Sequence, residues 1–171
     1  ALHGSEQFAN IVFFLAFLGF GIKAGFVPFH NWLPDAHPAA PSHVSAIMSG
    51  VMIKTGLYGI LRILFLIGTP SKCIAYTVFV VALVTALYGI LYALAQRDLK
   101  KLLAYSSIEN IGIIGLGIGL GMIGLAYGNQ LVAMLGFAGG ILHILNHSIF
   151  KELMFFGAGS VYNRTHTRDM E

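Results

Sequence analysis

The stretch GVMIKTGLYGILR, residues 50–62, is an apolar run of the kind that indicates the fold class, and it holds a single lysine, Lys54, near its middle. The whole chain of 171 residues has the same character, with 57% hydrophobic and only 10% charged residues. Soluble domains carry about 25% charged residues to cover their surface. A chain with so little charge has to be surrounded by lipid, and we therefore predict an integral membrane protein.

Apolar segments long enough to cross a bilayer follow one another along the chain. A spanning helix needs about 20 mostly apolar residues, and five segments meet this requirement: residues 8–29, 43–67, 75–96, 102–127 and 131–162. We predict an all-α bundle of five transmembrane helices that forms a single domain over residues 1–171. The glycine-rich run GIIGLGIGLGMIG, residues 112–124, predicts close helix packing. A phosphate-binding loop would need a preceding strand and a charged partner that this run lacks.

Basic residues in the connections predict how the bundle lies in the membrane. After the third and fifth spans come Arg97, Lys100, Lys101, Arg164 and Arg168, whereas the opposite side carries Lys72 and Arg62. Because cytoplasmic loops hold an excess of lysine and arginine, we predict that the connection QRDLKK, residues 96–101, faces the cytoplasm. Its three basic residues and Asp98 are expected to form a cytoplasmic anchor.

The first connection is rich in proline. It reads HNWLPDAHPAAPS, residues 30–42, and holds three of the five prolines of the chain. Proline removes a backbone donor and disfavours helix at the residue before it. We therefore predict an extended loop in which His30, Asp35 and His37 face solvent.

Lys54 lies deep within its predicted span. It follows Pro41 by 13 residues and precedes Pro70 by 16, which is about 20 Å along a helix from either flank. A lysine stem cannot reach water over that distance, and an ammonium at this depth costs at least about 3 kcal/mol. We predict that Lys54 faces a polar path inside the protein.

The fifth predicted span carries three ionisable residues at helical spacing. His143, His147 and Lys151 stand at i, i+4 and i+8, so they share one helix face within about 12 Å. Histidine titrates near neutral pH, and neighbours on this face could exchange a proton through water. For His143 in particular, a purely hydrogen-bonded packing role is the open alternative.

Two further charged residues have two interpretations each. Lys23 lies in GFGIKAGFVPF, residues 19–29, where glycines and Pro28 predict a broken helix; such breaks are tolerated where they line a cavity. The alternative is that Lys23 extends to the nearby membrane edge. Glu109 is either a buried counter-charge or a carboxylate near the start of its helix.

The chain resembles a known family on three long motifs: KAGFVPFHNWLPDAHPAAPSHVSAIMSGVMIKTGLYGILR at 23–62, QRDLKKLLAYSSIENIG at 96–112 and LNHSIFKELMFFGAGSVYNRTHTRDME at 145–171. These motifs are similar to the antiporter-like, proton-translocating membrane subunits of respiratory complex I, of Mrp antiporters and of membrane-bound hydrogenases. The acid at Glu109 favours the branch of hydrogenase-4 and formate hydrogenlyase.

The resemblance implies a larger fold of about fourteen spans with two inverted five-helix repeats, each with one broken helix. This chain would be an internal fragment that holds the seventh to eleventh spans. The resemblance assigns Lys23 to the broken helix, Lys54 to the next helix, and His147 with Lys151 to the eleventh. A glutamate of the fifth span and an ionisable residue of the second broken helix are missing. The fragment alone is therefore not expected to conduct.

The implied function is proton translocation across the cell inner (cytoplasmic) membrane by a subunit of an energy-converting hydrogenase or a complex I-like oxidoreductase. The predicted relay consists of Lys23, Lys54, Glu109, His143, His147 and Lys151. The expected partners are the lipid bilayer, other membrane subunits, a soluble redox arm reached through them, and protons or sodium. Redox cofactors, metals and nucleic acid are not expected on this chain.

Three alternatives stay open. The first is sodium/proton antiport of the Mrp type, and the second is a structural spacer in the membrane arm. The third is a haem-binding cytochrome with His43, His143 and His147 as ligands. It is disfavoured because His143 and His147 share one helix.

Overall fold

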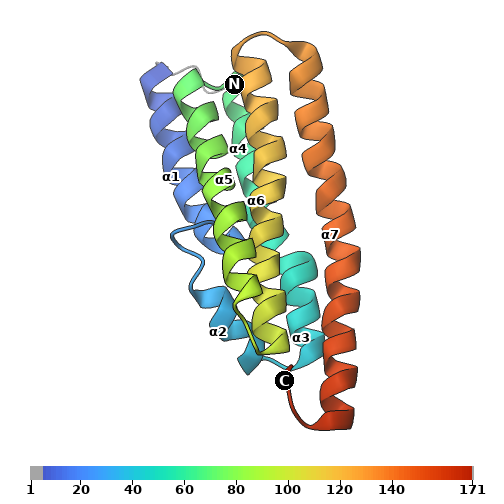
Figure 1. The fold of residues 1–171 in the computed structure, drawn as a ribbon. Coiled ribbons are helices and arrows are strands. Elements are labelled where there is room, and N and C mark those ends of the chain that lie inside the picture. Colours follow the sequence, from blue (N-terminus) through green and yellow to red (C-terminus); the bar gives the residue numbers. More distant parts are fainter. Residues whose placement is uncertain (1–5, 171) are drawn as a thin grey trace.

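The computed structural model describes residues 6–170 as a bundle of long helices that run alternately up and down (Figure 1). The elements in chain order are α1 (Glu6–Ala24), α2 (Trp32–Ala39), α3 (Ser42–Ile47), the π-helix η1 (Met48–Met52), α4 (Ile53–Ile67), α5 (Lys72–Leu94), α6 (Leu99–Ala126) and α7 (Gln130–Thr165). Within residues 6–170, five helical stretches are long and apolar enough to cross a membrane: Gln7–Ala24, Ser42–Ile67, Lys72–Leu94, Leu99–Ala126 and Gln130–Thr165. The predicted all-α membrane bundle is confirmed.

Helix α6 lies between α5 and α7, and its glycines let the backbones approach closely. A Cβ atom built on Gly117 would lie 2.8 Å from Cα of Gly140 in α7. One built on Gly119 would lie 2.8 Å from Cα of Phe79 in α5. Real Cβ atoms do not come this close to other heavy atoms, so these positions require glycine. The run at 112–124 therefore packs helices, as its composition predicts.

The first span is shorter than predicted, because α1 ends at Ala24 and not at residue 29. Gly25 adopts a φ of 88°, which ends the helix in the left-handed region that glycine allows. The amides of Gly25 and Phe26 both donate to the carbonyl of Gly21, at 2.9 and 3.0 Å. The chain then turns, and Phe26 is buried against the core.

The proline-rich connection is not the extended loop that the sequence predicts, because residues Trp32–Ala39 form α2. Pro34 is the third residue of this helix, where its missing N–H has no intrahelical acceptor to lose. The buried face of α2 includes Leu33 and His37, and α2 packs against α6. The predicted solvent exposure of His30 and His37 is therefore wrong, since their exposed fractions are 4% and 0%.

The second span contains a π-helical turn that its sequence does not predict. Between α3 and α4 the backbone forms the π-helix η1, which places one wider turn immediately before Lys54. π-Helical turns are rare and occur often at functional sites. The other predicted spans begin and end within three residues of α5, α6 and α7.

The α5–α6 connection and the C-terminal segment meet at the end of the bundle that also holds α2 (Figure 1). The amide of Leu99 donates to the carbonyl of Arg168 at 2.9 Å, and that of Met170 donates to the carbonyl of Arg97 at 3.1 Å. Asp98 caps α6 by accepting from the amide of Lys101 at 3.0 Å. Lys100, a member of the predicted cytoplasmic anchor, is only 5% exposed.

Candidate functional site

Lys54 lies at the start of α4 and is buried, with an exposed fraction of 8%. Its Nζ donates to the backbone carbonyl of Ser49 in η1. The wider π-helical turn brings this carbonyl within reach of the lysine that follows it. The protein therefore provides an acceptor for a charge that lipid could not solvate.

Two serine hydroxyls connect η1 to α6. The Oγ atoms of Ser49 and Ser107 lie 2.7 Å apart, and both residues are fully buried. Ser107 Oγ also lies 2.9 Å from the carbonyl of Leu103 and donates to it. A hydroxyl has only one hydrogen to donate, so Ser49 is the donor in the serine pair.

Lys151 in α7 is fully buried and points at the same turn of α6. Its Nζ donates to the carbonyl of Leu103 at 3.2 Å and to Ser106 Oγ at 2.8 Å. The carbonyl of Leu103 thus accepts from both Lys151 and Ser107. This shared acceptor connects the Lys54 side of the site to the Lys151 side.

Asn110 extends the network along α6 towards His143. Its Nδ2 donates to the carbonyl of Ser106 at 2.7 Å, and its Oδ1 lies 2.9 Å from His143 Nε2. Because Oδ1 can only accept, His143 donates through Nε2. Hydrogen bonds therefore connect residue to residue from Lys54 to His143, and at Ser49 and Ser106 the series passes between the backbone carbonyl and the hydroxyl of the same residue. We call this set the buried polar seam: Ser49, Lys54, Leu103 (carbonyl), Ser106, Ser107, Asn110, His143 and Lys151.

His147 lies on α7 between His143 and Lys151 and is fully buried. Its ring centroid is 6.3 Å from that of His143 and 5.2 Å from that of Phe150. Neither ring nitrogen has a hydrogen-bond partner among the described residues. His147 thus stands beside the buried polar seam with both of its proton-exchanging atoms uncommitted.

Besides His147, two further predicted relay residues lie outside the seam. Lys23 is exposed in the last turn of α1. Glu109 is half-buried, and its backbone packs against Gly89 of α5. Glu109 comes ten residues after Leu99, the first residue of α6, so the predicted alternative of a carboxylate at the helix start is wrong.

The histidines proposed as haem ligands in the third alternative do not converge. His43 is exposed in the first turn of α3, whereas His143 is hydrogen-bonded to Asn110 and His147 is buried.

An apolar cluster separates the seam from the end of the bundle that holds α2. It consists of Ala46, Leu103, Phe155 and Ala158. The ring of His37 stacks on that of Phe155, with centroids 4.6 Å apart. Burial lowers the pKa of His37 to about 4, and the positive charges of Lys151 and Lys100 act in the same direction. His37 is therefore neutral at neutral pH and belongs to the apolar closure of the seam.

The neutral members of the seam and the acid Glu152 were not among the residues predicted from the sequence. Ser106, Ser107 and Asn110 stand at i, i+1 and i+4 within a predicted span, and this polar spacing was a signal that could have been used. The same polar spacing does not indicate Ser49, because its contacts with Lys54 and Ser107 depend on the π-helix η1. The side chain of Glu152 packs against Gly50 of η1, on the same turn of α7 as Lys151.

Comparisons with known proteins agree with this architecture. Hydrogenase-4 component B of Escherichia coli (strain K12) is 50% identical over 170 residues, which are 98% of this chain and 25% of that protein. Formate hydrogenlyase subunit 3 of the same organism is 44% identical over 160 residues, which are 94% of this chain and 26% of that protein. The chain thus spans about a quarter of the length of these relatives.

A solved structure, that of the membrane-bound sulfane sulfur reductase, an archaeal respiratory membrane complex, contains a chain with the same fold. The TM-score is 0.84 at 30% identity, and the match covers 97% of this chain and 32% of the other. These similarities confirm the resemblance predicted from the three motifs. The model of the family described as NADH:quinone oxidoreductase/Mrp antiporter, transmembrane, matches residues 2–171. The chain therefore belongs to the NADH:quinone oxidoreductase/Mrp antiporter family of membrane proteins.

Proposed function

We propose that the protein translocates protons across the membrane and that the buried polar seam is a section of the proton path. The observation that carries this proposal is the series of hydrogen-bonded residues that leads from Lys54 to His143 across η1, α6 and α7. A backbone carbonyl accepts a hydrogen bond but cannot pass a proton on. The proposed transfers therefore run between the ionisable members Lys54, Lys151 and His143 through bridging water molecules, and the neutral groups of the seam hold these side chains in place. The section lies within the spans, where no bulk water is available.

The positions of the two buried lysines support a charge-coupled mechanism. Lys54 and Lys151 are joined through the Ser49–Ser107 pair and the carbonyl of Leu103. Two positive charges in a poorly polarisable interior repel each other strongly, so protonation of one lysine favours proton release from the other. Moving one charge across 100 mV costs about 2.3 kcal/mol, which is within the range that close buried charges supply.

His147 is proposed as the mobile carrier of this path. Both of its ring nitrogens are free to exchange protons, and it stands one helical turn from both His143 and Lys151. Lys23 and Glu109 stay in the proposed relay as links to polar groups beyond this section. Glu152 is added as a carboxylate near the Lys54 end.

The names of the relatives support the setting of this activity. Hydrogenase-4 component B and formate hydrogenlyase subunit 3 are parts of oxidoreductase complexes by name. We propose that this protein is likewise a subunit of an energy-converting hydrogenase or a complex I-like oxidoreductase in the cell inner membrane. The redox reaction takes place in a soluble arm, and other membrane subunits transmit its energy to the seam.

The test is proton uptake by vesicles that contain the whole complex with its full-length subunit. We expect Lys54→Met to lower the proton flux per redox turnover by at least tenfold, since methionine keeps the stem and removes the charge. Lys72→Met is the matched control, because Lys72 is exposed at the start of α5. A structural spacer would leave the flux unchanged in both variants.

Sodium transport is distinguished in the same vesicles. If protons are carried, replacing sodium by an impermeant organic cation leaves the proton flux unchanged. If sodium is exchanged for protons, the flux stops when sodium is removed, and the proton-pumping proposal fails.

A further inference from the structure

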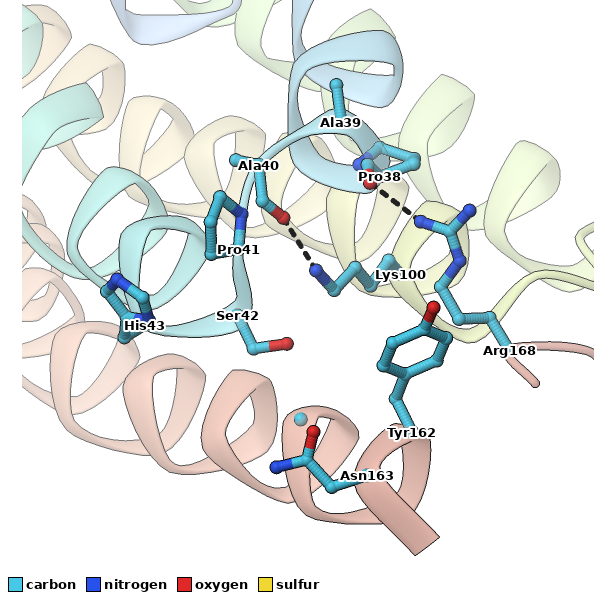
Figure 2. A pocket seen from close by; sticks show the side chains of 11 residues that line it. Pro38, Ala39, Ala40, Pro41, Ser42, His43, Lys100, Tyr162, Asn163 and Arg168 are labelled. Carbon is cyan, nitrogen blue, oxygen red and sulfur yellow. Dashed lines mark hydrogen bonds between the residues drawn. The ribbon is translucent and has the colours of Figure 1, made fainter. Parts of the chain in front are cut away.

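A cavity of about 540 Å³ opens at the end of the bundle that holds α2, outside the buried polar seam (Figure 2). Its wall is formed by the α2–α3 connection, the first turn of α6, the last turns of α7 and the C-terminal segment. The residues that line it are Pro38, Ala39, Ala40, Pro41, Ser42, His43, Lys100, Gly159, Tyr162, Asn163 and Arg168. The volume is that of a site for a small ligand, about 300–1,000 Å³.

Lys100 and Arg168 line this cavity, and each has more hydrogen-bond donors than the contacts described below use. Lys100 is only 5% exposed, and its Nζ donates to the carbonyl of Ala40 at 2.7 Å. An ammonium has three donors, and this is its one hydrogen bond to a described residue. Arg168 donates from Nη1 to the carbonyl of Pro38 at 2.6 Å, and its Nε lies 3.4 Å from Asp98 Oδ2. The guanidinium has five donors in all.

Neutral polar groups complete the wall. Ser42, Tyr162 and Asn163 place their polar ends in the space in front of Lys100 (Figure 2), and they make no side-chain hydrogen bond with a described residue. Gly159 keeps this space open, since a Cβ there would lie 2.7 Å from Cβ of Ser42. The described residues that line the cavity include no carboxylate.

We propose that this cavity binds a phosphate group, supplied either by the headgroup of an anionic phospholipid or by a free phosphate compound. A buried ammonium that contacts a single carbonyl is costly without an anion. Lysine and arginine together with hydroxyl and amide donors form the usual environment of a bound phosphate. Basic pockets between membrane helices are known to hold anionic headgroups.

The location favours a role in holding helices together. A phosphate in contact with Lys100, Ser42 and Tyr162 would connect the starts of two spans to the end of a third. The phosphate would also balance the positive charge of Lys100, while Asp98 keeps its ion pair with Arg168. This inference is independent of the proposed proton path, because the apolar cluster around Phe155 separates the two regions.

The test measures the thermal midpoint of the whole complex in nanodiscs of defined lipid. One arm compares phosphatidylcholine with phosphatidylglycerol, and the other adds inorganic phosphate to phosphatidylcholine discs against chloride at equal ionic strength. We expect a rise of several degrees. A rise with phosphatidylglycerol alone identifies a lipid headgroup, whereas a rise with inorganic phosphate identifies a soluble source. The absence of a rise in both arms overturns the proposal.

Variants assign the effect to the cavity. Lys100→Gln and Arg168→Gln are each expected to weaken the apparent affinity by about tenfold or more, and Tyr162→Phe by less. Lys101→Gln and Arg164→Gln are the matched controls, because both side chains are exposed and neither lines the cavity. Equal loss in the controls would show unspecific charge attraction and would refute the site. Should Lys100→Gln fail to assemble, Tyr162→Phe and the wild-type response to phosphate still decide the question.

Discussion

The two halves of α6 differ both in sequence and in surroundings. Residues 99–110 supply the carbonyl of Leu103, two serine hydroxyls and the Asn110 amide to the seam. Residues 111–126 present glycines and large apolar side chains to α5 and α7, and no side-chain hydrogen bond is described in that half. Close glycine packing leaves no room for water, so a proton path along α6 has to leave the helix near Asn110 and His143.

The largest expected effect is in the polar half and concerns Lys151→Met. Methionine keeps the length of the stem but removes the hydrogen bonds to Leu103 and Ser106, which interrupts the seam at its centre. We expect proton translocation by the reconstituted complex to fall at least about a hundredfold, or about 2.7 kcal/mol. Assembly should be preserved, because replacing a buried charge by an apolar group of similar size often stabilises a protein.

Lys101→Met is the control for this experiment, since Lys101 is exposed in the first turn of α6. Normal translocation by an assembled Lys151→Met complex would show that the two halves of α6 do not differ in function.

The closure of the polar half by His37 and Phe155 predicts a pH effect on stability. The pKa of His37 is lowered to about 4, so below about pH 6.5 the unfolded chain binds a proton that the folded chain does not. Stability is therefore lost as the pH falls from about 6.5 to 4, by about 2 kcal/mol between pH 7 and pH 5. His37→Phe keeps the ring and removes this contribution.

Thermal midpoints of the wild type and of His37→Phe at the two pH values give the measurement. His43→Phe serves for comparison, because His43 is exposed at the start of α3 and should keep the wild-type pH dependence. An unchanged pH dependence in His37→Phe would mean that His37 is accessible to water and that the seam is open at this end.

The apolar half is tested by Gly117→Ala. The added Cβ would lie 2.8 Å from Cα of Gly140, so α6 and α7 have to move apart, at a cost of at least about 1 kcal/mol. Gly139→Ala is the control, because a Cβ there meets nothing within 4 Å and alanine favours helix. We expect a lower thermal midpoint for Gly117→Ala alone. Equal thermal midpoints for Gly117→Ala and Gly139→Ala would show that close helix packing is not what distinguishes residues 111–126 from residues 99–110.

Much of this comparison could be predicted from the sequence, because hydropathy and charge report directly on burial in lipid. The five spans, the packing role of the glycines and the depth of Lys54 follow from residue type and spacing alone. The helix α2 was missed because the general rule for proline predicts a loop. Pro34, at the third position, loses no intrahelical hydrogen bond, and the eight-residue helix also holds Pro38 near its end. The predicted solvent exposure of His37 was wrong for the same reason, because the burial of this side chain depends on the packing of α2 against α6.

The network of the seam could be predicted only in part, because its contacts join residues far apart in the chain. His143, His147 and Lys151 share a helix face by spacing, but their partners Ser106 and Asn110 lie more than 30 residues away. The pairing of Ser49 with Ser107 depends on the π-helix, and no residue of MSGVM, residues 48–52, signals it. Local patterns therefore identify the charged groups, and tertiary packing selects the neutral groups that connect them.

The smallest expected effect separates these neutral connections from the charged groups. Ser107→Ala breaks the hydroxyl contact that the described residues make between η1 and α6. It leaves the hydrogen bond of Lys54 to Ser49 and those of Lys151 to Leu103 and Ser106 in place. A water molecule can replace a hydroxyl at small cost, so we expect the proton flux to fall about threefold, or about 0.7 kcal/mol. Ser160→Ala is the control, because its hydroxyl bonds only within its own helix at the exposed end of α7. A loss as large as that of Lys151→Met would mean that protons pass through the hydroxyl itself, whereas no loss would place the path beside Ser107, along His147 and Lys151.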